Sequence, residues 1–433
     1  MRLTSAPRTI IIVLIILVAA ICANAQSGDV RLDTLSLPKA IELALAYHPS
    51  VRSANATVRI ASSGVTQSVA GYLPTISSTM SGTKTSGAFV LNPSIPARIQ
   101  EYNNYSVAIQ GQETIYDFGK TSNRVSASYD SLEAANSDYQ VTKGNVILNV
   151  ELAYFGYVQA EKVIGVDEEA VSHADQHLKQ AQAFYKVGTR TQLDVTKAEV
   201  DLANANVGLI SAKNQLQLAK LQLENSMGMH PQGDYEVQDV LDVQPFPMPL
   251  DTAMKTAFEQ LPEYHAATAR LSQTKALVSA AWDQDLPTLL ATANYTWTNF
   301  YFPLLSRWTA GVTLNIPIFQ GFAIDAQVSQ AQASADASQA NLETLRESIR
   351  LNVEQNYYDM KEALDRIDAT DHLVESAEQS LTLAEKQYAA GVGSAIDVSD
   401  AQLELSNARI TRIQALYDYN SSLTKLKRAI GMF

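Results

Sequence analysis

Residues 148–154 read LNVELAY, and residues 351–357 read LNVEQNY. The two stretches begin 203 positions apart, and the same offset aligns further residues in the two halves of the chain. These pairs are Tyr185 with Tyr388, Gly188 with Gly391, Asp194 with Asp397, Leu202 with Leu405 and Gly228 with Gly431. Matches that keep one offset over such a length indicate an internal repeat. We therefore divide the chain into a first repeat at 26–230, a proline-rich linker at 231–250 and a second repeat at 251–433.

Each repeat is predicted to contain a leading helix, a pair of strands and two long helices. No proline occurs from Ala97 to His230 or from Ile318 to the end, so nothing interrupts a helix there. The segment 120–186 could form one helix of roughly 100 Å. The following helix has a heptad seam from Val195 to Ser226 in which leucine alternates with alanine. Gly188 and Gly391 break these columns into helical hairpins.

Strands are predicted from a period-two alternation of apolar residues between the helices. The apolar positions, which we expect to face lipid, are Tyr105, Val107, Ile109, Tyr295, Trp297, Trp308, Val312 and Leu314. Strands of about 9–13 residues suit a tilted crossing of the hydrocarbon layer. Four strands cannot close a barrel, and an open edge in lipid is not viable, so the chain must oligomerise. The alternative interpretation of the same alternation is the edge of a soluble sandwich.

The N-terminus is typical of secretion. Arg2 and Arg8 precede an apolar run from Ile10 to Cys22, and Ala23-Asn24-Ala25 follows as a cleavage site. We therefore predict a signal peptide at 1–25. A lipoprotein signal acylated at Cys22 is the alternative, and Ile21 stands where that signal favours a small residue.

Composition excludes several classes of function. The chain of 433 residues has a formal charge of −13 and no basic block, which disfavours nucleic acid as a partner. A single cysteine and scattered histidines give no metal site, and no nucleotide-binding or nucleophile motif is present. His173 and His177 lie four apart, but without an intervening glutamate they are interpreted as solvated helix residues. The chain is predicted to be neither an enzyme nor a cofactor-binding protein.

The order and duplication of short motifs resembles the TolC-like family of outer-membrane efflux proteins. Four short stretches carry the resemblance. They are the leading helix 37–45 with His48-Pro49, the strand entry Gly71-Tyr72-Leu73-Pro74, and the strand exits at 116–119 and 317–321. The fold that it implies is mainly α with membrane β: a trimeric channel with a 12-stranded β-barrel, four strands per chain, continued by a long coiled-coil α-barrel. The protein is then a homotrimer in outer-membrane lipid, extending into the periplasm. Its implied partners are a periplasmic adaptor (membrane fusion) protein and an inner-membrane pump.

The resemblance also implies a gate at the periplasmic mouth. Asp397 and Asp400 match the family's paired aspartates, and threefold symmetry would make them rings of negative charge. Tyr388 matches a residue that helps to hold the mouth closed. The alternative is that acids in a first helical turn only cap the helix, as expected for Asp194. Gly393 stands where some members carry an arginine, and Arg190 lies instead in the first hairpin tip.

The hairpin tips are predicted to contact the adaptor. Their residues are Val187, Gly188, Thr189, Arg190, Gly391, Val392 and Gly393. We therefore expect a passive exit duct of a tripartite efflux or type I secretion system, with drugs, metals and proteins all open as substrates. The alternatives are a periplasmic coiled-coil adaptor and an envelope tether without a pore.

Overall fold

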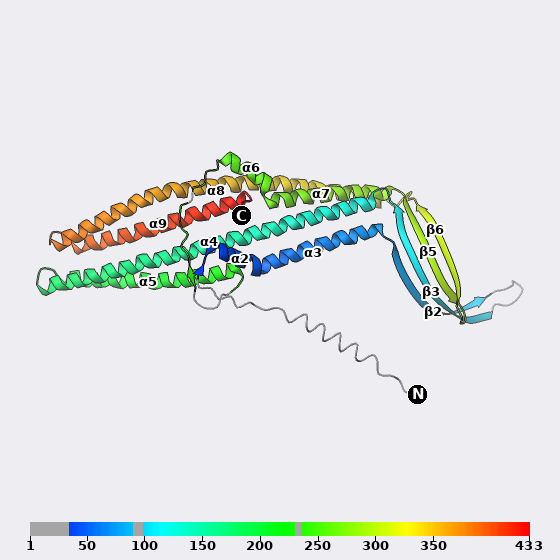
Figure 1. Ribbon diagram of the computed structural model, residues 1–433, viewed down its shortest axis with the longest axis horizontal. Coiled ribbons are helices and arrows are strands. Elements are labelled where there is room, and N and C mark those ends of the chain that lie inside the picture. The colour runs from blue at the N-terminus through cyan, green and yellow to red at the C-terminus, as the bar shows by residue number, and fades with distance from the viewer. Residues whose placement is uncertain (1–33, 90–97, 230–234, 244) are drawn as a thin grey trace, which may run out of the picture.

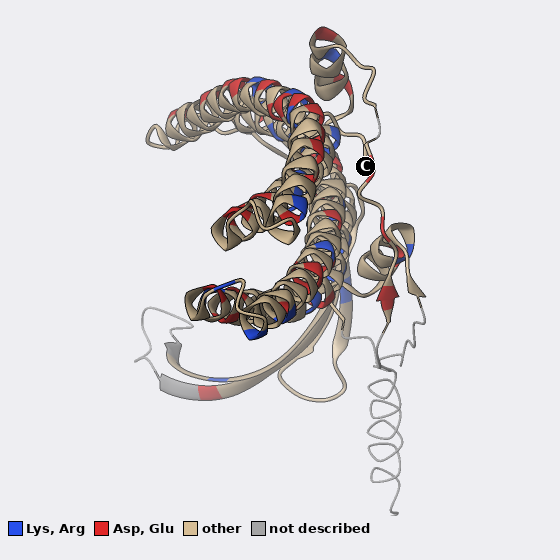
Figure 2. Ribbon diagram, turned by 90° about the vertical axis from the view of Figure 1, so that its left-hand side faces the viewer, with Lys and Arg blue, Asp and Glu red and all other residues tan. Residues whose placement is uncertain are grey.

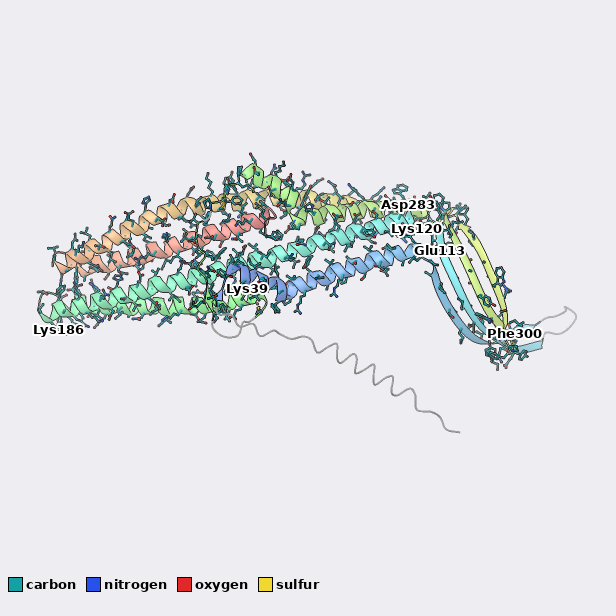
Figure 3. The ribbon with its side chains drawn as sticks, in the orientation of Figure 1. Lys39, Glu113, Lys120, Lys186, Asp283 and Phe300 are labelled. Carbon is teal, nitrogen blue, oxygen red and sulfur yellow. The ribbon has the colours of Figure 1, made fainter. Side chains whose placement is uncertain are left out.

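A computed structural model describes residues 34–89, 98–229, 235–243 and 245–433 of the chain. The signal peptide predicted at 1–25 lies outside these residues. The described part is elongated, with long helices lying side by side and a four-stranded sheet at one end (Figure 1). Lys186 marks the tip of the helices and Phe300 the far end of the sheet (Figure 3).

Two sets of elements follow one another in the same order. The first set is α2 (Leu37–Tyr47), α3 (Pro49–Val69), β2 (Thr75–Phe89), β3 (Arg98–Tyr116), α4 (Lys120–Lys186) and α5 (Gln192–Met227). The second set is α6 (Leu250–Gln260), α7 (Pro262–Trp282), β5 (Thr288–Asn299), β6 (Leu305–Asn315), α8 (Ala323–Ala389) and α9 (Ala395–Ala429). Short strands β1 (Thr34–Leu35) and β4 (Glu236–Val237) pair in parallel.

The prediction of a single leading helix in each repeat is wrong, because two helices stand in its place. Pro49 begins α3 and Pro262 begins α7. Proline lacks the N–H that a continuous helix needs, and it favours an extended conformation in the residue before it. His48 and Leu261 adopt that conformation, with ψ of 127° and 118°. The leader therefore bends at these points.

The long helices match their prediction. α4 and α8 are each 67 residues long, and α4 has the predicted bounds. Gly188 and Gly391 have φ of +75° and +80°, a backbone that suits glycine and turns each column back on itself. The α5 seam is buried at Val195, Ala198 and Ala212. The α4–α5 hairpin is therefore held by the predicted close-packed seam.

The helices form a curved wall one layer thick. Near the sheet, neighbours follow the order α3, α4, α7, α8, and toward the tips the two hairpins meet through α4 and α9. Viewed from the tips, the wall is concave on one side and the short strands lie on its convex side (Figure 2). There the buried Tyr154 hydroxyl lies 3.0 Å from the Leu35 carbonyl oxygen and 2.7 Å from that of Gln238. These contacts attach the β1–β4 pair to α4.

The sheet is antiparallel in the order β2-β3-β5-β6. Its register places Val107 opposite Trp297, and Tyr295 lies between Ile109 and Trp308. The predicted apolar residues therefore share one face, although their contact with lipid stays a prediction. β2 and β3 have 15 and 19 residues, more than the predicted 9–13, because their hairpin extends past the end of β5 and β6. Within the described residues, the outer edges of β2 and β6 pair with no strand.

The junction between sheet and helices is a tight corner. Asp117 accepts a hydrogen bond from the Thr121 amide at 2.8 Å, and Gly119 has φ of +108°. Asn123 on α4 donates to Asp283, next to α7, at 2.6 Å, which ties the two repeats together here. The labels of Glu113, Lys120 and Asp283 mark this corner in Figure 3. Among the described residues, no helix is both long and apolar enough to span a bilayer.

Candidate functional site

The two hairpin tips begin their second helices in the same way. Thr191 and Asp194 form a reciprocal capping box at the start of α5, with the Thr191 amide donating to Asp194 at 2.9 Å. Ser394 and Asp397 form the equivalent box at the start of α9, also at 2.9 Å. Such boxes satisfy helix amides that otherwise lack partners. The backbone bond from Thr191 holds the pKa of Asp194 below its ordinary value.

An arginine from the first tip reaches across to the second. The Arg190 guanidinium donates to the Gly393 carbonyl at 2.8 Å and approaches the Tyr388 carbonyl at 3.4 Å. It also lies over the Tyr388 ring, 4.6 Å from the ring centroid. Hydrogen bonds and a cation–π contact thus converge on one side chain. We call Arg190, Tyr388 and Gly393 the tip clamp.

Tyr388 is the buried centre of this clamp. Its side chain is 0% exposed, and its ring lies 5.1 Å from His177 and 5.7 Å from Phe184, measured between centroids. Its hydroxyl has no hydrogen-bond partner among the described residues. Burial raises the pKa of Tyr388. Packing and the stacked guanidinium, rather than a hydroxyl hydrogen bond, therefore hold this ring.

His177 is not the solvated residue that the sequence suggested. It is half-buried against Tyr388, and burial lowers its pKa from the ordinary value, while Asp201, Glu385 and Asp194 oppose that shift. His173 fits the prediction better, since its side chain is 40% exposed beside Glu385. His177, Ala181 and Phe184 lie at intervals of four and three, the spacing of one helix face. That periodicity could have identified the face that receives Tyr388.

Gly393 has no room for a side chain. A Cβ atom there would lie 2.9 Å from the Tyr388 amide nitrogen and 3.0 Å from the Gln387 carbonyl carbon. Both are backbone atoms, so relief requires the tip itself to move. An arginine at this position is therefore incompatible with this turn, and Arg190 reaches the Gly393 carbonyl from the other hairpin.

The structure distinguishes the two predicted gate aspartates. Asp397 is exposed, and its carboxylate is occupied in the capping box. Asp400, also exposed, lines a groove of about 650 Å³ between the two hairpins. We call this space the inter-hairpin groove; its other lining residues include His173, Asp201, Asn204, Glu385 and Asn407. The structure thus brings Tyr388 and Arg190 together, while Asp397 and Asp400 lie outside that contact.

Further bonds join the hairpins along the groove. Ser399 on α9 donates to Asp201 on α5 at 2.5 Å. Arg409 on α9 pairs with Glu169 on α4 and, at 2.8 Å, with Glu378 on α8. The tip clamp is therefore the terminal member of a series of contacts between the hairpins.

The predicted tip residues outside the clamp are exposed. Val187 and Val392 are 71% and 82% exposed, and Gly188, Thr189 and Gly391 are also exposed. Arg190 differs, because it is half-buried in the clamp. Contact of these residues with an adaptor stays a prediction.

Comparisons with known proteins identify the family of the chain. The family model for outer membrane efflux proteins matches residues 40–229 and 253–432. TolC of Escherichia coli K12 is 25% identical over 76% of this chain and 70% of its own length. Protein CyaE of Bordetella pertussis is 25% identical over 88% of this chain and 80% of its own.

Solved channels share the fold. The CusC structure has a TM-score of 0.84 at 18% identity, covering 94% of this chain and 95% of that one. The CmeC channel of Campylobacter jejuni has a TM-score of 0.82 at 21% identity, covering 91% and 85%. The chain belongs to the outer membrane efflux protein family. It is an outer-membrane protein of TolC-like fold, with a barrel continued by a helical barrel into the periplasm.

Proposed function

We propose that three copies of this chain form a passive exit duct in a tripartite efflux or type I secretion system. The observation that carries the proposal is the sheet with two unpaired edges attached to 67-residue helices. Three copies supply twelve strands, and β6 of one copy can then pair with β2 of the next. No edge is then left open in lipid.

An exposed apolar stripe on α5 supports assembly through the helices as well. It lies on the side of α5 away from the buried seam and consists of Leu193, Val200, Val207, Ile210, Leu218 and Leu221. α8 exposes Leu351, Tyr358 and Leu383. Large apolar side chains at heptad spacing are typical of a second helix–helix interface. A neighbouring copy would cover them and close the curved wall into a tube.

The tips and the inter-hairpin groove are the proposed adaptor site. The groove is open, is lined by all four long helices and carries both polar and apolar groups. A helical hairpin of a periplasmic adaptor fits such a groove, with Val187 and Val392 at its end. An inner-membrane pump beyond the adaptor would supply the energy, since the sequence contains no nucleotide-binding motif.

The tip clamp is the proposed lock of the periplasmic mouth. It ties the two hairpins of one chain at their ends, through Arg190, Tyr388 and Gly393. Asp397 and Asp400 follow on α9 and would form rings of negative charge around the mouth in a trimer. Opening would separate the tips and widen that ring.

The proposal is tested with the purified mature chain. We expect a heat-resistant trimer in the outer-membrane fraction that conducts ions in a planar bilayer. Multivalent cations should block it, and the double variant Asp397→Ala, Asp400→Ala should weaken the block. A salt-extractable monomer without conductance would instead favour a tether. Unchanged block in a conducting variant would remove the aspartates from the gate and leave the duct intact.

A further inference from the structure

The polar face of the sheet is almost free of charge. Along β2 it carries only serine and threonine from Thr75 to Thr85, and along β5 only threonine and asparagine from Thr292 to Thr298. The β3 positions on this face, from Asn104 to Gln112, are also uncharged. This face lies opposite the apolar residues, so it lines the bore of the proposed barrel.

Among the side chains that the structure describes, one charged residue breaks this pattern. In the four-stranded sheet, the charged residues whose side chains the structure describes are Lys84, Glu101, Glu113 and Arg307. The register places the first three on the apolar face, where Lys84 also pairs with Glu101 across β2 and β3. Among these four residues, Arg307 alone lies on the polar face. It is exposed and makes no ion pair with any described residue.

The neighbours of Arg307 across the sheet are uncharged. Thr296 is its partner on β5, and the register continues through Ala108 to Thr79. In the sequence, neither 90–97, between β2 and β3, nor 300–304, between β5 and β6, contains an acidic residue. A neighbouring copy presents β2, whose polar face offers only hydroxyl groups. Assembly therefore adds no carboxylate from the strands to neutralise this guanidinium.

We propose that Arg307 forms a ring of three positive charges that binds multivalent carboxylate anions in the barrel bore and makes the outer part of the duct anion-preferring. This inference rests on the proposed trimeric duct. Fixed rings of one sign favour ions of the opposite sign. The guanidinium presents several N–H donors that match carboxylate oxygens, and the surrounding hydroxyls can donate further hydrogen bonds.

The dimensions allow the ring to act across the whole bore. Twelve strands spaced about 4.8 Å apart and tilted by about 40° give a backbone diameter of about 24 Å. An extended arginine reaches about 6 Å inward, which leaves about 6 Å to the axis. That gap is shorter than the Debye length of about 8 Å at physiological salt. An ion that moves along the axis therefore still experiences the electric field of the arginines.

The position along the duct separates this ring from the mouth. Arg307 is the third residue of β6, at the end of the sheet remote from the helices, whereas Asp397 and Asp400 lie at the opposite end of the molecule. The duct would then carry filters of opposite sign in series. Solutes with anionic groups would pass the outer filter most readily.

The experiment measures reversal potentials in a KCl gradient and conductance block by trimesate, a rigid tricarboxylate, for the full mature chain. Arg307→Gln should lower the chloride-to-potassium permeability ratio roughly twofold and weaken trimesate block at least about fivefold. Arg307→Lys should retain most of the block. Lys84→Gln removes the same charge from the outer face and should leave both quantities unchanged.

The outcomes separate this inference from the duct itself. A wild-type chain that forms no channel contradicts both, because a charge ring needs a bore. A conducting wild type whose selectivity and trimesate block are unaltered in Arg307→Gln contradicts the ring alone. Equal changes in Arg307→Gln and Lys84→Gln also overturn it, since they would reflect overall charge rather than position.

Discussion

The two hairpin tips have the same plan but opposite roles in the clamp. Both turn at a glycine and begin the next helix with a capping box. They differ where the clamp is made. Tyr185 of the first tip is 46% exposed and its counterpart Tyr388 is 0% exposed, while Arg190 of the first tip corresponds to Gly393 of the second. The duplicated unit has therefore diverged into a donor tip and an acceptor tip.

This comparison shows how a repeat acquires a specific contact. The turn and cap are local features, so both copies keep them. The clamp needs one arginine and one open carbonyl, and two identical tips cannot supply both with this geometry, since Gly393 admits no side chain. Changes at equivalent positions of the two tips should therefore have unequal effects.

The largest inequality is expected between the two tyrosines. Tyr388→Ala removes a fully buried ring and should cost about 3–5 kcal/mol of tip stability, whereas Tyr185→Ala should cost under about 1 kcal/mol. Trypsin cleavage after Lys186 and Lys386 measures opening of the tips. Tyr388→Phe serves as the control and should behave as the wild type, because the lost hydroxyl has no described partner. Equal cleavage of the two alanine variants would refute the asymmetry.

Loss of the arginine should have the next largest effect. Arg190→Ala removes charge-assisted hydrogen bonds and a cation–π contact, together about 2–4 kcal/mol. We expect a higher open probability in single-channel recordings. Lys186→Ala, an exposed cation four residues earlier, is the matched control. If both variants open equally, the clamp does not hold the mouth.

The contact between the two tips should also loosen with acid. Because burial lowers the pKa of His177 below 6.5, the unfolded state takes up a proton more readily than the folded one. Tip stability should therefore fall as the pH decreases through 6.5 toward the lowered value, and then level off. Hydrogen exchange of the 173–190 and 384–398 peptides, corrected for intrinsic rates, measures this. His177→Gln should abolish the dependence and His173→Gln should preserve it.

The smallest difference is expected between the caps. Asp194→Asn and Asp397→Asn remove equivalent capping carboxylates and should each cost about 0.5–2 kcal/mol. Cleavage at the two tips should then rise by similar factors. A much larger effect at Asp397 would show that this residue has a role beyond its cap.

Local sequence patterns predicted most of the fold, whereas contacts between residues far apart in the sequence could not be predicted. The absence of proline over 97–230, together with the turn glycines, predicted the position of α4. The alternation of residues in β6 predicted the apolar face of the sheet. Both patterns depend only on residues that are close in the sequence. The breaks at Pro49 and Pro262 were accessible in the same way but were missed. The contact of Arg190 with Gly393 joins residues 203 positions apart, and no periodicity encodes it.

The divergence of the tips also lowers the symmetry of the proposed assembly. Three copies present six hairpins, and identical tips would give them pseudo-sixfold equivalence. Because one tip donates Arg190 and the other accepts it, the hairpins alternate between two kinds and only the threefold axis survives. A ring of six identical adaptor subunits would therefore meet two different kinds of binding site in alternation. Its subunits must either adopt two conformations or bind as alternating pairs.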